Sequence, residues 1–425
     1  MRLGLDCRTI LNPKSGEQAG VGYYTYYLAK NLLAQDTKNH YVLFFDDHFK
    51  DFGEFEGDRV KIKTFPFYQY KKYLPVTYSQ MLISAFLKRE KLDLLHSPAN
   101  IIPLFYNQPA VVTVHDLAIY KYPEFFPKKF LSRQAFATRV LVPQTLKKAQ
   151  KIIAVSKNTK KDIIELFGVP EEKIVVIYEG IVGFNEQSNL ALADLRSRFG
   201  ILGRYLLFIG TIEPRKNITT LVRAFRNLLL SYESPAKDLQ LIIAGAKGWN
   251  NEAIFKAISD ANASIIGQKS RRSGRERRRG LDFRSVGRRQ REGDRRNNQE
   301  RRSSESIKYL GYISQAEKQT LLKSAMAFIF PSLYEGFGLP VLEAMNAGAP
   351  VITSKVGSLP EIAGRQAALL IDPNKEAQLT EAISQLLTDE GQREFLKIKG
   401  QERSKDFSWE KCARETLAVY HSVLK

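Results

Sequence analysis

The stretch YEGFGLPVLEAMNAG carries two glutamates eight positions apart, Glu335 and Glu343. Carboxylates at this spacing could form a general acid and base, hold the hydroxyls of a ligand, or be ordinary charges around a helix start. Gly336 and Gly338 lie between them, and Pro340 suits the first position of a helix, which would place Glu343 in the first helical turn. Backbone N–H groups left open by the glycines at a positive helix end would attract a phosphate. The pattern therefore favours a loop that holds a ligand over an acid–base pair.

A second candidate site lies in GTIEPRKN, directly after the predicted strand Tyr205–Gly210. Arg215 and Lys216 precede a helix that is expected to begin at about Asn217. Two cations beside a helix N-terminus would form an anion clamp suited to a diphosphate. The alternative is a solvated loop. It is less favoured because these residues follow a strand end, which is the ligand-facing edge of such a sheet.

Polar groups also end a strand in the first half of the chain, where His115 and Asp116 follow a run of valines. In a parallel sheet such a pair would point toward a ligand, although a histidine capped by its neighbouring aspartate is an equal alternative. Upstream, Gly20 and Gly22 directly precede a helical stretch. They would let a backbone approach an anionic ligand closely, or form no more than a tight turn.

These candidates are positioned by short apolar runs that alternate with helical patterns, which is typical of parallel sheets with crossover helices. The pattern restarts after an interruption near 180–189. It predicts an α/β protein with two Rossmann-like parallel-sheet domains facing each other across a cleft at the carboxyl ends of their strands. The predicted domains are residues 1–185, residues 186–405, and a C-terminal helix in 406–425 that packs back toward the first domain. The predicted strands are Leu3–Cys7, Tyr41–Phe45, Val60–Phe65, Leu92–His96, Val111–His115, Ile152–Ser156, Ile174–Ile177, Tyr205–Gly210, Leu239–Ala244, Ile307–Leu310, Ala327–Phe330, Pro350–Thr353 and Ala368–Ile371.

The formal net charge of +20 raises the question of nucleic-acid binding. The segment 268–306 holds fifteen Lys and Arg against six Asp and Glu, so it contributes 15 − 6 = +9 of that charge. It is too poor in apolar groups to bury a core, and Phe283 is its only aromatic residue for stacking on bases. We expect an Arg-rich insertion that is disordered or a frayed helix, and nucleic-acid binding is the less favoured alternative.

Several motifs agree with one family. Glu335 and Glu343 with the intervening GFGLPVL resemble the E-x7-E signature of the retaining group 1 glycosyltransferases (family four), which have the GT-B fold. GTIEPRKN, AGAKGW, LGYIS, GSLPEIAG and FSWEK in the second half resemble that family in matching order, as do AGVGYYTYYL and HDLAIYKYPEFFP in the first half. The resemblance covers nearly everything outside the Arg-rich segment.

The resemblance implies roles for the glutamate stretch. Glu343 matches the acid that holds the ribose of a nucleotide-sugar donor, and Glu335 matches the acid beside the transferred sugar. Phe337, Gly338 and Leu339 match the backbone that contacts that sugar and the pyrophosphate.

It also implies roles elsewhere. Arg215 and Lys216 match the diphosphate clamp, and His115 matches a histidine near the reacting sugar. Gly20 and Gly22 match a loop beside the donor phosphates.

Gly210 is counted with the donor-binding residues, and directly after it the chain departs from the common family pattern. Many members have Gly-Arg there, whereas Gly210 is followed by Thr211. Arg215 and Lys216 must then stabilise the leaving diphosphate without that arginine.

The resemblance thus implies a retaining, metal-independent glycosyltransferase without a cofactor. Its form is closest to mannosyltransferases of surface-polysaccharide assembly, which suggests GDP-mannose as donor and a glycan or lipid-linked saccharide as acceptor. A sugar-nucleotide epimerase of the same fold is the other enzymatic alternative.

Two cysteines at opposite ends of the chain and without ligand spacing, Cys7 and Cys412, fit a reducing cytoplasm. FPFYQYKKYLPVTYSQML and YKYPEFFPKKFLSRQAF mix aromatics with cations, which would suit peripheral contact with the inner face of an anionic membrane.

Overall fold

The computed structural model describes residues 1–10, 20–67, 76–127, 134–183, 190–231, 236, 238–279 and 305–424. Parts of the predicted features therefore lie outside the described residues: 68–75 and 128–133 of the two aromatic and basic stretches, and 280–304 of the Arg-rich segment.

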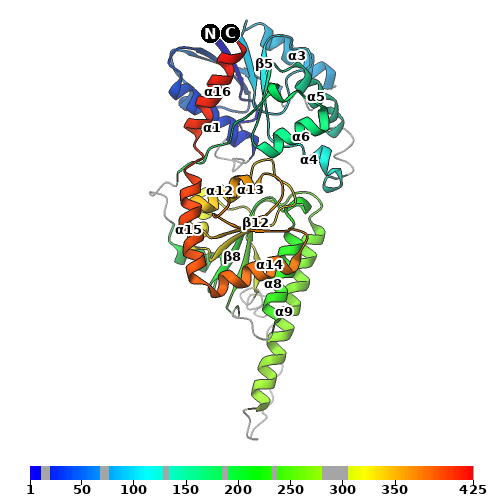
Figure 1. The fold of residues 1–425 in the computed structure, drawn as a ribbon, viewed down its shortest axis with the longest axis vertical. Helices are drawn as coiled ribbons and strands as arrows, with labels where there is room; N and C mark the ends of the chain where they lie inside the picture. The colour runs from blue at the N-terminus through cyan, green and yellow to red at the C-terminus, as the bar shows by residue number, and fades with distance from the viewer. Residues whose placement is uncertain are drawn as a thin grey trace. The chain divides into compact units, whose positions relative to one another are not determined.

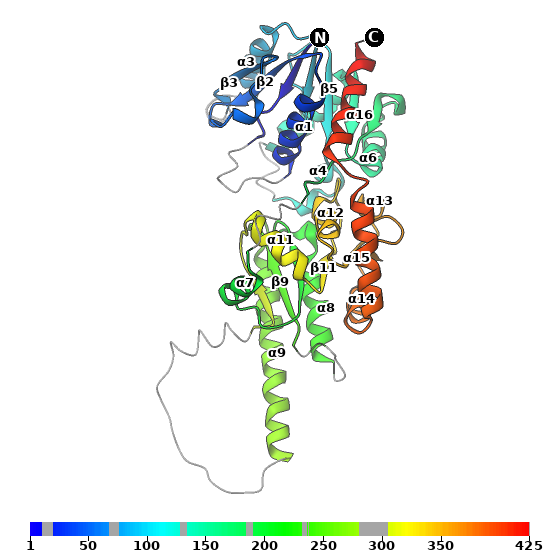
Figure 2. The same ribbon diagram turned by 90° about the vertical axis from the view of Figure 1, so that its left-hand side faces the viewer.

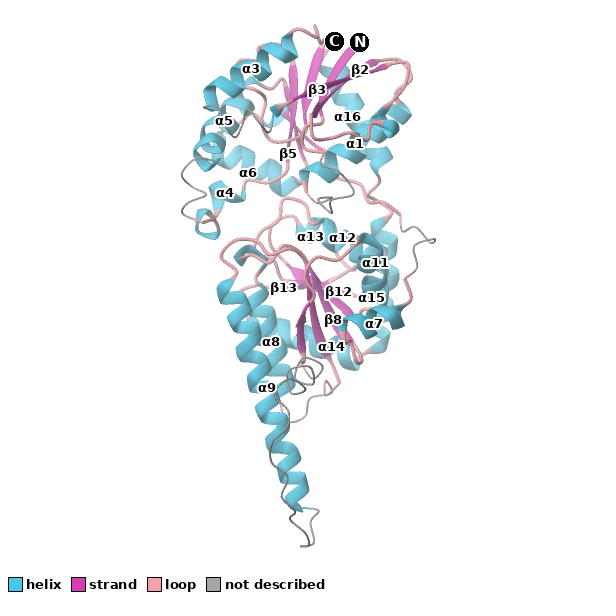
Figure 3. Cartoon of the chain, turned by 180° about the vertical axis from the view of Figure 1, so that it is seen from behind, coloured by secondary structure: helices cyan, strands magenta, loops and turns pink. Residues whose placement is uncertain are grey.

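The chain divides into two compact units. The first comprises Met1–Gly183, Glu335–Leu339 and Lys405–Lys425, and the second comprises Phe184–Tyr334 and Pro340–Ser404. Each unit is built on one parallel sheet that helices flank on both faces (Figure 3). The fold is therefore α/β with two Rossmann-like units, as the alternating pattern predicts.

The first unit holds a seven-stranded sheet in the order β3-β2-β1-β4-β5-β6-β7. Every strand pair is parallel. Strands β4 and β5 are buried along their whole length, and β1, β2 and β6 are buried at every residue but the first. Helices cover both faces of the sheet, which explains the mostly apolar sequences of these strands. The strands are β1 (Arg2–Asp6), β2 (His40–Asp46), β3 (Val60–Phe65), β4 (Leu94–Ser97), β5 (Ala110–Val114), β6 (Lys151–Ala154) and β7 (Ile174–Val176).

Two groups of helices cover this sheet. Helices α1 (Val21–Gln35) and α16 (Trp409–Val423) pack against each other (Figure 1). Helices α3 (Val76–Lys88), α5 (Gln134–Lys148) and α6 (Lys157–Phe167) contribute buried apolar side chains to a common core with the strands. A short helix, α4 (Ala118–Lys121), follows β5.

The sequence pattern indicates a helical stretch over 143–149. The structure corrects this: α5 begins at Gln134, and Pro143 lies inside it. The packing of Val142 and Leu146 in the core maintains the helix across the missing proline N–H.

Charged groups tie the amino ends of the strands to the end of α3. The Glu90 carboxylate pairs with Arg2, Lys61 and Lys63 at 2.8, 2.9 and 3.1 Å. Burial alone would raise the pKa of Glu90, but hydrogen bonds from the three cations outweigh it and lower this pKa to about 2.

The second unit holds a six-stranded parallel sheet in the order β10-β9-β8-β11-β12-β13. The predicted strands of this half are all present, with ends that differ by one residue at most. They are β8 (Tyr205–Ile209), β9 (Gln240–Ala244), β10 (Ile307–Tyr309), β11 (Ala327–Phe330), β12 (Val351–Ser354) and β13 (Leu369–Ile371). The accompanying helices are α7 (Leu192–Phe199), α8 (Ile218–Leu230), α9 (Glu252–Arg279), α11 (Gln315–Ser324), α12 (Leu339–Asn346), α13 (Leu359–Ala363), α14 (Glu376–Thr388) and α15 (Glu390–Ser404).

Helix α9 is longer than the sequence pattern predicts. The apolar periodicity indicates a helix over 251–261, but α9 continues to Arg279 and so includes the first part of the Arg-rich segment (Figure 2). Residues with good helix propensity follow the apolar part, and the Gln268 amide donates to the Leu230 carbonyl oxygen at 2.9 Å, which ties α9 to the end of α8.

None of the helices in the described part of the chain is both long and apolar enough to cross a bilayer.

Candidate active site

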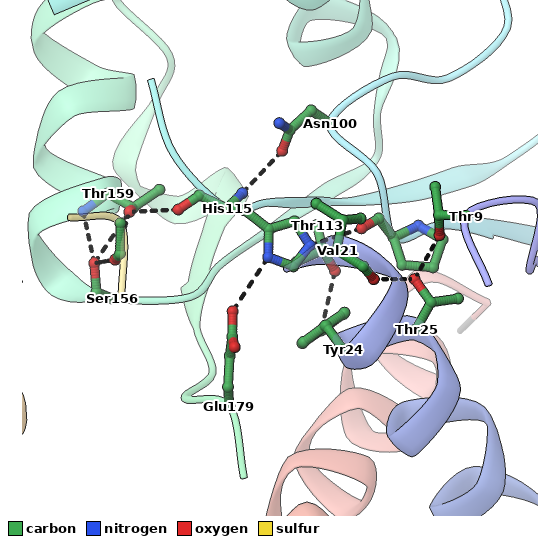
Figure 4. Close-up of polar contacts among 12 residues, drawn as sticks. Thr9, Val21, Tyr24, Thr25, Asn100, Thr113, His115, Ser156, Thr159 and Glu179 are labelled. Carbon is green, nitrogen blue, oxygen red and sulfur yellow. Dashed lines mark hydrogen bonds and ion pairs between the residues drawn. The ribbon is translucent and has the colours of Figure 1, made fainter. Parts of the chain in front are cut away.

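His115 lies directly after β5, and its backbone and both ring nitrogens make polar contacts (Figure 4). Its backbone N–H donates to Asn100 Oδ1 at 2.8 Å. Its ring Nε2 lies 2.8 Å from the Pro98 carbonyl oxygen, and Nδ1 lies 3.2 Å from Glu179 Oε1. The edge-on ring of Tyr24 packs against the imidazole with 4.7 Å between centroids. The histidine is therefore fixed from several sides.

The alternative that Asp116 caps His115 is wrong. The Asp116 carboxylate accepts the backbone N–H of Ala118 at 3.1 Å, at the start of α4. The acidic partner of the histidine is Glu179 instead, which is distant in sequence and follows β7.

Gly336 of the glutamate stretch packs onto the same region of the first unit. Its carbonyl oxygen accepts the hydroxyls of Ser156 at 2.6 Å and Thr159 at 3.1 Å, at the N-terminus of α6. A Cβ at this position would lie 1.8 Å from the His115 carbonyl oxygen, so only glycine fits. The structure thus joins two motifs that the sequence presents separately.

The neighbouring residues of this stretch are also fixed. Phe337 is buried, and its ring lies near those of Tyr178 and Phe407, with centroids at 6.1 and 5.9 Å. Gly338 has a φ of 119°, a conformation that favours glycine, and Glu335 is buried.

Gly20 and Gly22 shape the start of α1. Gly20 is the N-cap residue with a φ of 66°. A Cβ on Gly22 would lie 2.4 Å from the Thr9 carbonyl oxygen, and the hydroxyls of Thr9 and Thr25 lie 3.0 Å apart (Figure 4). A tight turn against Thr9 therefore accounts for Gly22, and a role beside donor phosphates stays a prediction.

In the second unit, Arg215 connects the loop after β8 to the loop after β11. Its Nε and Nη2 donate to Glu213 Oε1 at 3.0 and 2.7 Å, and its Nη1 donates to the Tyr334 carbonyl oxygen at 2.8 Å. The Arg215 carbonyl oxygen in turn accepts the backbone N–H of Leu333 at 2.9 Å. The guanidinium is thus held in one orientation at the ends of two adjacent strands.

Lys216 lies beside it in the same single turn of 3₁₀ helix, Pro214–Lys216, directly before α8. It is buried, with Nζ 5.0 Å from the centre of the Phe330 ring. The buried Lys216 ammonium and the fixed Arg215 guanidinium therefore come from one turn. These are the two residues that the sequence predicts as an anion clamp.

The backbone of Gly210 packs closely against the loop after β9, where Gly245 leaves room for it. The Gly210 N–H donates to Ala244 at 3.0 Å, and a Cβ on Gly245 would lie 2.0 Å from the Gly210 carbonyl oxygen. The loops after β8 and β9 then continue side by side through a bridge between Ile212 and Lys247.

Glu343 is paired in this structure. Its Oε1 lies 2.5 Å from Nζ of Lys318 on α11, and both side chains are 17% exposed. The helix begins one residue earlier than predicted, at Leu339, so Pro340 is its second residue and Glu343 lies in the second turn. The prediction that Glu343 lies in the first turn of the helix is therefore wrong, because the helix begins one residue earlier than predicted.

Sequence reasoning missed Glu179 and Lys318. Nothing in their spacing marks them, since Glu179 lies 64 residues from His115 and Lys318 lies 25 residues from Glu343. The polar break after β7 and the cationic face of a predicted helix were the only signals available.

Among the described residues, Asp46, Asp47 and His48 form the one group close enough to share a cation. His48 is exposed, and the Asp46 carboxylate raises its pKa by hydrogen bonding. This group follows β2 and contains none of the predicted site residues, so metal independence stays a prediction.

Two Rossmann-like units with polar loops at strand ends define the α/β GT-B class. Solved structures share the fold over almost the whole chain. Sucrose-phosphate synthase from Thermosynechococcus elongatus has a TM-score of 0.67 at 20% identity and covers 99% of this chain and 98% of its own. Anabaena Alr3699/HepE in complex with UDP-glucose has a TM-score of 0.67 at 18% identity, with coverage of 99% and 100%.

Sequence comparison identifies the family. The model for glycosyl transferases group 1 matches residues 278–403, and that for glycosyltransferase family 4 matches residues 19–182. The O-antigen chain mannosyltransferase B of Escherichia coli is 32% identical over 313 residues, which are 73% of this chain and 70% of that protein. The chain belongs to the group 1 glycosyltransferases.

Proposed function

We propose that this chain is a retaining, metal-independent glycosyltransferase that moves mannose from GDP-mannose to a glycan or lipid-linked saccharide in surface-polysaccharide biosynthesis. The observation that carries the chemistry is the fixed Arg215 guanidinium beside the buried Lys216. The similarity to an O-antigen mannosyltransferase supports the choice of sugar and pathway.

Breaking the bond between the sugar and the donor phosphate leaves a diphosphate whose negative charge grows in the transition state. Arg215 and Lys216 supply two positive charges at the ends of β8 and β11. Because Glu213 and the Tyr334 carbonyl hold the guanidinium in place beforehand, little reorganisation is required when the charge develops. These cations provide what a divalent metal would otherwise supply.

Glu343 is the proposed ligand of the donor ribose. Lys318 binds one of its oxygens, so the carboxylate stays oriented while hydroxyls approach it. Glu335 would lie beside the transferred sugar. The anomeric configuration would be retained because the acceptor hydroxyl attacks the face of the sugar from which the phosphate leaves. A phosphate oxygen would take up the proton of that hydroxyl.

A lipid-linked acceptor would bring the protein to the inner face of the cytoplasmic membrane, and α3 offers a surface for such contact. Tyr78 and Met81, one turn apart, are 56% and 47% exposed, and Phe105 in a nearby loop is 42% exposed. That loop is joined to α3 because the Leu104 N–H donates to Gln80 Oε1 at 3.1 Å. Exposed apolar groups of this kind insert at a membrane surface. Stronger co-sedimentation with anionic than with zwitterionic vesicles would support this contact, and equal binding to both would refute the electrostatic part.

A thermal-shift comparison tests the donor. We expect GDP-mannose to raise the melting temperature more than UDP-glucose or ADP-glucose at the same concentration, because a ligand that binds only the folded state stabilises it. Glu343→Ala should abolish the GDP-mannose shift. Glu402 is exposed and pairs with Lys399, so Glu402→Ala is the matched control and should keep the GDP-mannose shift.

A shift with UDP-glucose alone would refute GDP-mannose as the donor. An undiminished GDP-mannose shift in Glu343→Ala would refute the ribose assignment.

A further inference from the structure

We propose that Glu179 is a positioning residue for the transfer reaction: it shares a proton with His115 and fixes the imidazole to the segment that connects the two units. This inference rests on the proposed function, in which His115 lies near the reacting sugar. It adds a residue outside every motif that identifies the family.

Hydrogen-bond chemistry determines where the protons of the imidazole lie. The Pro98 carbonyl oxygen can only accept, so Nε2 of His115 carries a proton and donates it at 2.8 Å. Nδ1 faces the Glu179 carboxylate at 3.2 Å, and this contact holds only if one proton lies between the two atoms. Both ring nitrogens are therefore engaged by the protein, which fixes the imidazole in one orientation.

Both members of this pair are buried. Glu179 is 5% exposed and His115 is 9% exposed. Burial raises the pKa values of Tyr24 and Cys412, and burial followed by the charge of His115 lowers that of His96 to about 3. These neighbours on α1, α16 and β4 stay neutral near pH 7. Asp116, the next residue, is bound to the start of α4.

The backbone after Glu179 is clamped to the end of the chain. The Ile181 N–H donates to the Phe407 carbonyl oxygen at 3.3 Å, and Ile181 forms a parallel bridge with Ser408. A Cβ on Gly180 would lie 2.2 Å from the Trp409 nitrogen, so the two segments pass in direct contact. The chain leaves the first unit after Gly183, contributes Glu335–Leu339 to it, and re-enters it at Lys405, so the Ile181–Phe407 contact lies close to two of these crossings.

Tyr24 completes the connection. Its ring lies 4.7 Å from that of His115 and 5.7 Å from that of Trp409. Its hydroxyl lies 3.2 Å from Thr113 Oγ1, next to the histidine on β5. His115 is thus held between the connecting segment on one side and a ring packed against α16 on the other.

Histidine-selective NMR and steady-state kinetics test the proposal on the full chain. Glu179→Gln keeps the shape and removes the charge, and Glu179→Ala removes both. Glu171→Gln, at a residue that is 76% exposed, is the matched control. His96, which also has both ring nitrogens engaged but by hydroxyls, is an internal NMR reference.

We expect the Nδ1 resonance of wild-type His115 to show a hydrogen bond to the Glu179 carboxylate. In Glu179→Gln this resonance should move, because a neutral amide replaces the carboxylate. The kcat should fall about 10- to 100-fold with donor KM changed less than about 3-fold, as for an interaction used in the transition state. The kcat of Glu179→Ala should fall further than that of Glu179→Gln, and the kcat of Glu171→Gln should equal that of the wild type.

Identical His115 signals in wild type and Glu179→Gln would overturn the proposal, as would full activity of Glu179→Ala. If the wild type transfers no sugar but the NMR difference is present, the proposed function fails while the pairing of Glu179 with His115 stands.

Discussion

Replacing Arg215 with lysine keeps the positive charge and removes its geometry. The guanidinium makes three hydrogen bonds, two to Glu213 and one to the Tyr334 carbonyl oxygen. A lysine ammonium has no planar fork and cannot keep this set. Losing one charge-assisted hydrogen bond of this kind costs about 1.5–3 kcal/mol. If the charge is used only as the diphosphate leaves, this corresponds to a fall in kcat of roughly 10- to 100-fold.

Initial rates of GDP release over a range of GDP-mannose concentrations measure this effect. The donor KM of Arg215→Lys should stay within about 3-fold of the wild type, since the ribose site is untouched. Arg226→Lys is the control, because Arg226 lies in the same unit and its guanidinium contacts only the exposed neighbouring Asn227. An unchanged kcat in Arg215→Lys would refute the role of the fixed guanidinium.

Three further substitutions probe other parts of the structure. Gly336→Ala should lower both the melting temperature and kcat, because its Cβ would meet the His115 carbonyl oxygen at 1.8 Å; calorimetry and rates check this. Lys318→Met should raise the donor KM about 10-fold by leaving Glu343 without its cation, and a KM equal to that of the wild type would contradict the pairing. Glu90→Gln should cost about 2 kcal/mol of unfolding free energy at pH 7, after a discount for its half-exposed partners. Because folding lowers the pKa of Glu90 from 4.5 to about 2, that stabilisation is present above pH 4.5 and is lost as the pH falls toward 2. Urea unfolding at pH 7 and pH 3 should therefore show a smaller difference in unfolding free energy between the wild type and Glu90→Gln at the lower pH.

The strands were predictable from the sequence because both sheets are covered on two faces. Continuous apolar runs such as Leu206–Ile209 have no other stable environment, and their lengths suit strands. Helix ends were less predictable. Pro143 marks a helix start by local preference, but tertiary packing keeps it inside α5.

The partners within the candidate site were beyond sequence reasoning because they join distant segments. Glu343 and Arg215 stand out through local spacing, whereas Glu179 and Lys318 matter only through contacts made after folding. The contact between Arg215 and the Tyr334 carbonyl spans 119 residues. Such pairings follow from the order of strands in the sheet, which no local pattern of residues encodes.

Product analysis tests the central claim most directly. The full chain is incubated with GDP-mannose carrying ¹³C at the anomeric carbon and with a lipid-linked saccharide acceptor, and the product is examined by NMR. The account predicts one GDP released for each new mannosidic bond, with the α configuration of the donor retained. Release of GDP with free mannose and no new glycosidic bond, or a β-linked product, would contradict it.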